Sequence, residues 1–126
     1  MKILGIDYGA KNIGIAISDE EQRIAFPKIV LKNDLTFFNL LKEIIEKEGV
    51  LKIVLGESKD FKMKDNPIMK DVERFKKDLN EKIGLEIVMF PEILTSHQAA
   101  KMMGEKNKMI DASAAAIILQ SYLDSK

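Results

Sequence analysis

The chain has 126 residues, with 20 basic and 20 acidic side chains and a formal net charge of zero. This length fits one domain over residues 1–126, because two domains of half the size would each have too small a core. Apolar residues make up 46% of the chain, which excludes a disordered protein. The absence of cysteine excludes disulfides, thiolate metal sites and cysteine nucleophiles. A single histidine, His97, excludes any site built on two.

The charge balance and the apolar runs also limit the partners and the location of the chain. No apolar run is long enough to cross a membrane, and the N-terminus has the pattern of a strand rather than of a signal peptide. We therefore expect a cytoplasmic protein with no membrane partner. Zero net charge argues against a polybasic binder, so a nucleic-acid partner would have to meet a local basic patch.

Hydrophobic periodicity and turn chemistry predict nine elements in the order β-β-β-α-β-α-β-α-α. The strands are expected over residues 2–8, 13–18, 24–31, 51–56 and 85–90. The helices are expected over residues 35–48, 67–83, 95–103 and 110–123. Asp34 is expected to cap the first helix, which ends at Gly49. Pro27 cannot donate to a strand ladder, which predicts an edge position or a bulge in the third strand.

The connections between these elements predict the sheet. Short turns join the first three strands, which are therefore antiparallel, whereas the two later strands arrive through helical crossovers and are parallel. The expected architecture is an α/β fold in which helices flank a mixed five-stranded sheet.

Three carboxylates occupy positions where such a sheet places functional groups. Asp7 ends the first strand, Glu92 follows the fifth, and Asp111 opens the last helix on the stripe that also carries Ala115 and Ile118. Oxygen ligands without thiolate or several imidazoles suit Mg²⁺ or Mn²⁺. Two such ions about 3.5–4 Å apart can activate a water and stabilise an in-line phosphoryl displacement. The alternative is that the three acids are a turn acceptor, a helix cap and a surface acid.

Several stretches carry a family resemblance in the same order along the chain. Residues 5–19, GIDYGAKNIGIAISD, resemble the pattern G-x-D-x-G-x-K-R-I-G-x-A-x-S-D. Residues 91–96 (PEILTS), 106–111 (KNKMID) and 114–124 (AAAIILQSYLD) continue it to the end of the chain. Together these stretches resemble the YqgF/RuvX family of RNase H-like nucleases, which are known as pre-16S rRNA nucleases or Holliday junction resolvase-like proteins.

The resemblance implies an RNase H-like fold, and it carries a metal-ligand and catalytic role onto Asp7, Glu92 and Asp111. Other RNase H-like nucleases place a metal-binding acid at the end of the fourth strand, where this chain has Glu57. Glu57 is therefore kept as a fourth ligand or as a substitute for Glu92, against the alternative of a solvated loop acid.

Lysines accompany these acids in the sequence. Lys11, Lys106 and Lys108 are expected to contact nucleic-acid phosphates, although each also fits an ordinary surface lysine. Two arginines of the family pattern are replaced by Asn12 and Ile93. These losses keep open a member of the fold that binds nucleic acid without cleaving it.

The function that follows is a divalent-metal-dependent nuclease that hydrolyses phosphodiester bonds, with 5′-end processing of pre-16S rRNA as the preferred role. A Holliday junction resolvase-like endonuclease acting on branched DNA is the alternative, and it would work as a two-fold dimer. The residues leave a monomer and a homodimer equally open. An ATPase of the actin and sugar-kinase type opens with a similar hairpin but needs a second domain, for which 126 residues leave no room.

Overall fold

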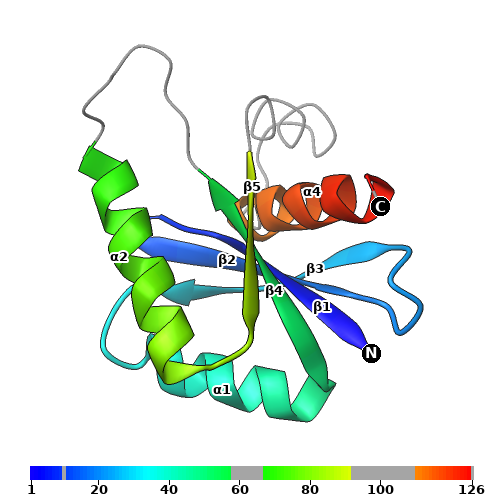
Figure 1. Ribbon diagram of the computed structural model, residues 1–126, viewed down its shortest axis with the longest axis horizontal. Coiled ribbons are helices and arrows are strands. Elements are labelled where there is room, and N and C mark those ends of the chain that lie inside the picture. Colours follow the sequence, from blue (N-terminus) through cyan, green and yellow to red (C-terminus); the bar gives the residue numbers. More distant parts are fainter. Residues whose placement is uncertain (10, 58–66, 92–109, 126) are drawn as a thin grey trace.

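The computed structural model describes residues 1–9, 11–57, 67–91 and 110–125, and these contain a five-stranded sheet of order β3-β2-β1-β4-β5 (Figure 1). The strands are β1 (Lys2–Asp7), β2 (Asn12–Ser18), β3 (Ala25–Lys32), β4 (Val50–Glu57) and β5 (Glu86–Pro91). The first three strands pair antiparallel, and β4 pairs parallel with both β1 and β5. The mixed sheet predicted from the connections is confirmed.

Helices pack on both faces of this sheet (Figure 1). The helices α1 (Phe37–Glu48) and α2 (Pro67–Lys82) share one core with Leu4 and Ile6 of β1. The helix α4 (Ile110–Asp124) forms a second core with Ile3 of the same strand, on the opposite face. The helix predicted over residues 95–103 lies outside the described residues. Among the helices that are described, none combines the length and apolar character needed to cross a membrane.

The start of α1 differs from the sequence expectation. Thr36, not Asp34, is the N-cap residue, and the first helical residue is Phe37. The Asp34 carboxylate instead accepts hydrogen bonds from the Thr36 hydroxyl, at 2.6 Å, and from the Thr36 N–H, at 2.9 Å. These bonds hold the pKa of Asp34 below its usual value. Leu35 falls in the turn between them and is 98% exposed, so the apolar stripe of α1 begins at Phe37.

The position of Pro27 confirms the expectation drawn from its missing N–H. β3 is an edge strand, and its register against β2 shifts where Ile15 pairs with Ile29 but Ala16 pairs with Pro27. Lys28 is the extra residue of this bulge. Both features let the strand accept a residue that cannot donate to the ladder.

The helix α4 lies unusually close to β1 at Gly5. A Cβ atom placed on Gly5 would lie 2.9 Å from the Cβ atom of Leu119 and 3.0 Å from the carbonyl oxygen of Ala115. The helix therefore rests on bare backbone, and only glycine fits beneath it. Gln120 fixes the far end of α4, because its Oε1 accepts from the Ala25 N–H and its Nε2 donates to the carbonyl of Arg23.

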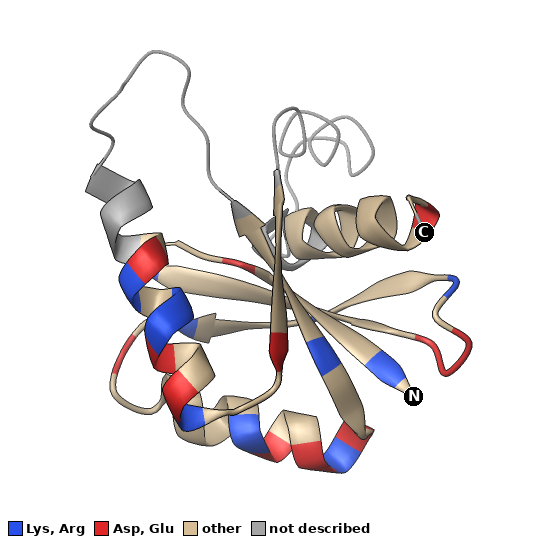
Figure 2. Ribbon diagram, viewed as in Figure 1, with Lys and Arg blue, Asp and Glu red and all other residues tan. Residues whose placement is uncertain are grey.

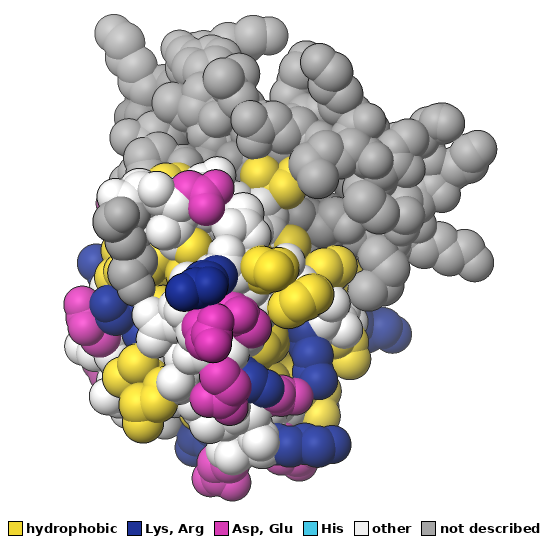
Figure 3. All heavy atoms as spheres, turned by 90° about the vertical axis from the view of Figure 1, so that its right-hand side faces the viewer, with side chains coloured by type: hydrophobic (Ala, Val, Ile, Leu, Met, Phe, Trp, Pro, Cys, Tyr) yellow, Lys and Arg dark blue, Asp and Glu magenta, His cyan; other side chains and the backbone are white. Residues whose placement is uncertain are grey.

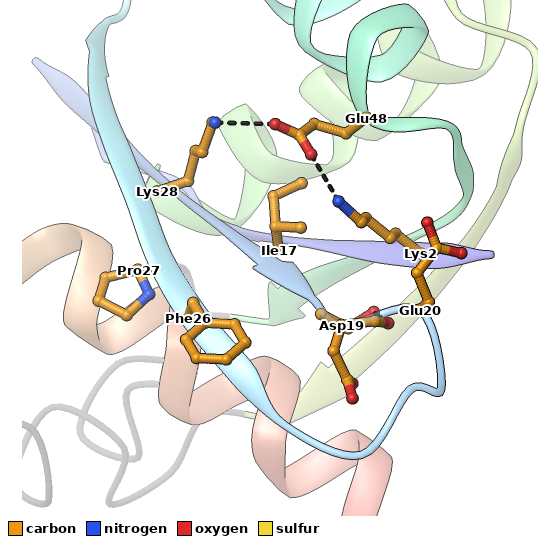
Figure 4. Close-up of a pocket in the computed structure, with 9 residues that line it drawn as sticks. Lys2, Ile17, Asp19, Glu20, Phe26, Pro27, Lys28 and Glu48 are labelled. Atoms are coloured by element: carbon orange, nitrogen blue, oxygen red, sulfur yellow. Dashed lines mark hydrogen bonds and ion pairs between the residues drawn. The ribbon is translucent and has the colours of Figure 1, made fainter.

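A three-membered ion cluster ties the end of α1 to the start of β1 and to β3 (Figure 4). The Glu48 carboxylate lies 2.7 Å from the Lys2 ammonium and 2.9 Å from that of Lys28, the bulge residue. Hydrogen bonds from Lys2 and Lys28 lower the pKa of Glu48 to about 2. The cluster borders a pocket next to Phe26, and both of its lysines are paired with the one carboxylate.

The two faces of the sheet differ in charge. α1 and α2 carry many charged side chains, whereas α4 carries charge only at Asp124 among its described side chains (Figure 2). On the side of the molecule that Figure 3 displays, basic, acidic and hydrophobic side chains alternate over the described residues. The described part of that side therefore offers a nucleic acid no continuous basic surface.

The contact at Gly5 predicts the effect of adding a single methyl group. We expect Gly5→Ala to lower the free energy of unfolding by about 1–3 kcal/mol, because α4 must shift away from β1. Urea denaturation followed by circular dichroism measures this loss. Lys32→Ala, at an exposed strand position, should change the same quantity by no more than about 0.5 kcal/mol. Equal stability of Gly5→Ala and the native protein would contradict the close contact.

The lowered pKa of Glu48 predicts acid sensitivity. A carboxylate whose folded pKa is about 2 and whose ordinary value is 4.5 stabilises the fold above pH 4.5 and ceases to do so as the pH falls towards 2. Glu48→Gln should therefore reduce stability at pH 7 by on the order of 1–2 kcal/mol and flatten the decline between pH 4.5 and 2. Denaturation at several pH values measures both effects. Glu46→Gln, an exposed position on the same helix, should leave the pH profile unchanged.

Candidate functional site

Asp7 is the described residue on which the candidate site is built. It is the last residue of β1, and it is half-buried. Side chains alternate along a strand, so Asp7 shares a face with Gly5, the residue that α4 covers. The carboxyl group therefore lies on the α4 face of the sheet, at the carboxyl end of a central strand.

The carboxyl ends of two further strands lie at the same edge. Because β4 runs parallel to β1 and Ile6 pairs with Leu55, the last residue of β4, Glu57, lies just beyond the level of Asp7. Glu57 in turn pairs with Pro91, the last residue of β5. The chain therefore leaves β1, β4 and β5 at one edge, which is where open α/β sheets bind ligands.

The direction of α4 brings its first turn to this edge. Gln120, near the end of the helix, bonds Ala25 at the start of β3, whereas Ala115 lies over Gly5 in the middle of β1. α4 therefore runs antiparallel to β1, and its N-terminal turn lies towards Asp7. Asp111 is in that turn, four residues before Ala115, so its position belongs to the sheet-facing stripe.

The turn that follows β1 is held from two sides. A Cβ atom on Gly9 would lie 2.3 Å from the carbonyl oxygen of Asn12, so this tight turn requires glycine. Asn33, which follows β3, donates its side-chain amide to the carbonyl of Gly9 and its backbone N–H to that of Lys11, both at 2.9 Å. The exposed Lys11 is thereby fixed on a turn only a few residues from Asp7.

The residues predicted from the sequence to form the site are described to different extents. Asp7 and Lys11 are described in full and lie at one edge of the sheet. Glu57 and Asp111 are placed there by their backbone positions, and their side chains are outside the described set. Glu92, Lys106 and Lys108 lie outside the described residues. Within the part of the chain that is described, no three potential ligands come together as a metal-binding group.

Sequence reasoning missed a hollow on the opposite face of the same edge. Tyr8, the residue after Asp7, lines it together with Asn33 and Arg74. The periodicity of α2 identified Phe75 as a core residue but gave no reason to single out its neighbour. The scarcity of arginine was the available signal, because Arg74 is one of only two in the chain.

The donor chemistry at the edge fits a hard divalent cation. Every acid expected there, namely Asp7, Glu57, Glu92 and Asp111, offers carboxylate oxygen, which Mg²⁺ and Mn²⁺ prefer. The N-terminus of α4 is an additional favourable place for negative charge.

Comparison with solved structures identifies the architecture as the RNase H-like fold of resolvases. The RuvC of T. thermophilus in complex with a Holliday junction substrate matches 99% of this chain and 95% of its own, with a TM-score of 0.62 and 14% identity. The fowlpox virus resolvase in complex with Holliday junction DNA matches 99% of this chain and 98% of its own, with a TM-score of 0.51 and 16% identity. The fold expected from the sequence is confirmed.

Sequence comparison defines the family. The RuvX family model, described as Holliday junction resolvase, matches residues 1–125. A protein from Caldanaerobacter subterraneus subsp. tengcongensis is 37% identical over the whole chain and 98% of its own length, and one from Geobacillus thermodenitrificans is 36% identical over 99% of its length. Both are named "Putative pre-16S rRNA nuclease". This chain belongs to the RuvX family.

A metal held by several carboxylates should stabilise the folded chain. We expect 10 mM Mg²⁺ or Mn²⁺ to raise the melting temperature by about 3–6 °C relative to EDTA, because the cation would bind the folded state and not the unfolded one. Asp7→Asn should abolish this response, whereas Glu81→Gln, at an exposed position on α2, should retain it. A melting temperature that is the same in metal and in EDTA would count against a metal centre at this edge.

Proposed function

We propose that the protein is a divalent-metal-dependent nuclease that hydrolyses phosphodiester bonds in the precursor of 16S rRNA. The observation that carries the proposal is the position of Asp7. Its carboxyl group lies at the carboxyl end of a central strand, on the α4 face, where the ends of β4 and β5 and the first turn of α4 meet. The names of full-length relatives support ribosomal RNA as the substrate class.

In this proposal Asp7, Glu92 and Asp111 hold Mg²⁺ or Mn²⁺, with Glu57 as a fourth ligand or a substitute for Glu92. When bound, such a cation supplies Lewis-acid chemistry, activating a water and neutralising charge at the phosphate. The half-buried position of Asp7 limits competition from bulk water, and the contact of α4 with Gly5 keeps the two elements that carry Asp7 and Asp111 close together.

The lysines position the substrate backbone. Lys11 lies exposed on the turn that Asn33 fixes, so its ammonium group can meet a phosphate close to Asp7. Lys106 and Lys108 are proposed to contact the same strand from the segment before α4. Each neutralised phosphate would steepen the salt dependence of binding. Precursor rRNA is a cytoplasmic substrate, and the cytoplasm is where we expect this protein to act.

The description of the family model favours a second candidate function, cleavage of branched DNA. An enzyme of that kind would act on a four-way junction as a two-fold dimer, because the junction presents pairs of equivalent strands. Sedimentation of the protein with and without a four-way junction measures its oligomeric state. A dimer on the junction would favour branched DNA as the substrate.

Cleavage assays separate these functions. We expect purified protein with Mn²⁺ to cut a 5′ precursor fragment of 16S rRNA, EDTA to stop the reaction, and Asp7→Asn to reduce the rate by at least about 100-fold, because a ligand would be lost. A four-way DNA junction is tested in parallel, and Glu81→Gln is the control. Cleavage of the junction alone would establish the resolvase-like function. Binding of RNA without cleavage, unchanged in Asp7→Asn, would establish the catalytically silent alternative.

A further inference from the structure

The hollow beside Tyr8 lies next to the candidate site but on the other face of the sheet. It has a volume of about 140 Å³, roughly the space of five water molecules. Four different parts of the chain form it: the residue after β1, the residue after β3, α1 and α2. Its lining residues are Tyr8, Asn33, Phe38, Arg74, Phe75 and Asp78.

Two polar groups of this hollow, the Arg74 guanidinium and the Tyr8 hydroxyl, have no partner among the described residues. Arg74 is exposed and makes no ion pair there, although Asp78 is one helical turn away. The Tyr8 hydroxyl makes no hydrogen bond within that same part of the chain. The pocket beside Glu48 is different, because the charges around it are already paired (Figure 4). Among the described residues, the hollow beside Tyr8 therefore offers a ligand a cation without a carboxylate partner, whereas both lysines of the Glu48 pocket are already paired.

The walls of the hollow are held in place without a ligand. The Tyr8 ring packs on Phe75 with the ring centroids 4.8 Å apart, and Phe38 packs on Phe75 at 5.7 Å. The side chain of Asn33 is anchored through its amide to the carbonyl of Gly9. A ligand would therefore lose little affinity to the ordering of these side chains.

The chemistry of the lining fits one nucleotide. A guanidinium group such as that of Arg74 binds phosphate in a bidentate manner. The edges of Tyr8 and Phe38 offer an aromatic surface to a base. Asn33 and Asp78 add an amide and a carboxylate, which can hydrogen-bond base edges or ribose hydroxyls. The volume admits a single ring system, so the phosphate would remain outside, near Arg74.

We propose that this hollow binds a nucleotide of the substrate strand adjacent to the bond that is cut, with Arg74 on its phosphate. The proposal rests on the proposed nuclease function and extends it to a second contact on the far face. Tyr8 and Asp7 are consecutive, so their Cα atoms are about 3.8 Å apart while their side chains point to opposite faces. A single strand passing over this edge of the sheet would meet both.

Two measurements on the full chain test the proposal. The first is an NMR titration with adenosine 5′-monophosphate in EDTA, in which the Asn33 side-chain amide and the Arg74 Nε–H are the reporters. We expect these signals to shift and the dissociation constant to rise about tenfold in Arg74→Ala. Tyr8→Phe keeps the aromatic ring but removes the hydroxyl, and it should raise the dissociation constant about threefold. Arg23→Ala, which removes the exposed arginine of the β2–β3 hairpin, should leave it unchanged.

The second measurement is the steady-state cleavage of the rRNA fragment. Arg74→Ala should raise KM about tenfold and leave kcat within about twofold, because the contact is made equally in the ground and transition states. Absence of shifts in the titration, or equal affinity of Arg74→Ala and the native protein, would overturn the nucleotide site. Cleavage by the native protein with an unchanged KM in Arg74→Ala would overturn it while leaving the nuclease intact. If the native protein cleaved no rRNA fragment, the proposed nuclease function would be refuted. The titration would still show whether the hollow binds a nucleotide.

Discussion

The contact between α4 and the backbone of β1 at Gly5 is the constraint on which the rest of the structure depends. It brings a helix that is nearly free of charge onto the centre of the sheet, with Leu119 and Ala115 separated from the strand by no side chain. The same contact sets the height of α4 above β1 and hence the distance between Asp7 and the first turn of the helix. A site shared between these two elements therefore requires glycine two residues before the acid.

Much of the family-like pattern has an architectural explanation. Ser18 is buried, where its hydroxyl accepts from the Ile3 N–H and donates to the carbonyl of Asp19. The Asp19 carboxylate accepts from the backbone N–H groups of Ile24 and Arg23, which lower its pKa. These residues fix the β2–β3 hairpin, to which the end of α4 is then attached. The pattern thus preserves the frame around Asp7 as well as Asp7 itself.

The sequence was sufficient to predict the order of the described elements and the mixed sheet, because apolar period and connection length determine both. It failed at the start of α1, where Asp34 and Thr36 are both good caps and only the fit of Phe37 into the core selects between them. Asp7 was predictable from its place at a strand end. The hollow beside Tyr8 was not, because it joins residues from four separate parts of the chain whose proximity follows from packing.

The bulge at Lys28 has a further consequence for the behaviour of the sheet in concentrated solution. β3 exposes Phe26 and Ile29 along an open edge, an arrangement that would ordinarily template the addition of a foreign strand. Pro27 removes one amide donor from that edge, and the extra residue breaks the regular spacing of the others. Both features disfavour the addition of a strand from another molecule along this edge, beside the exposed side chains of Phe26 and Ile29.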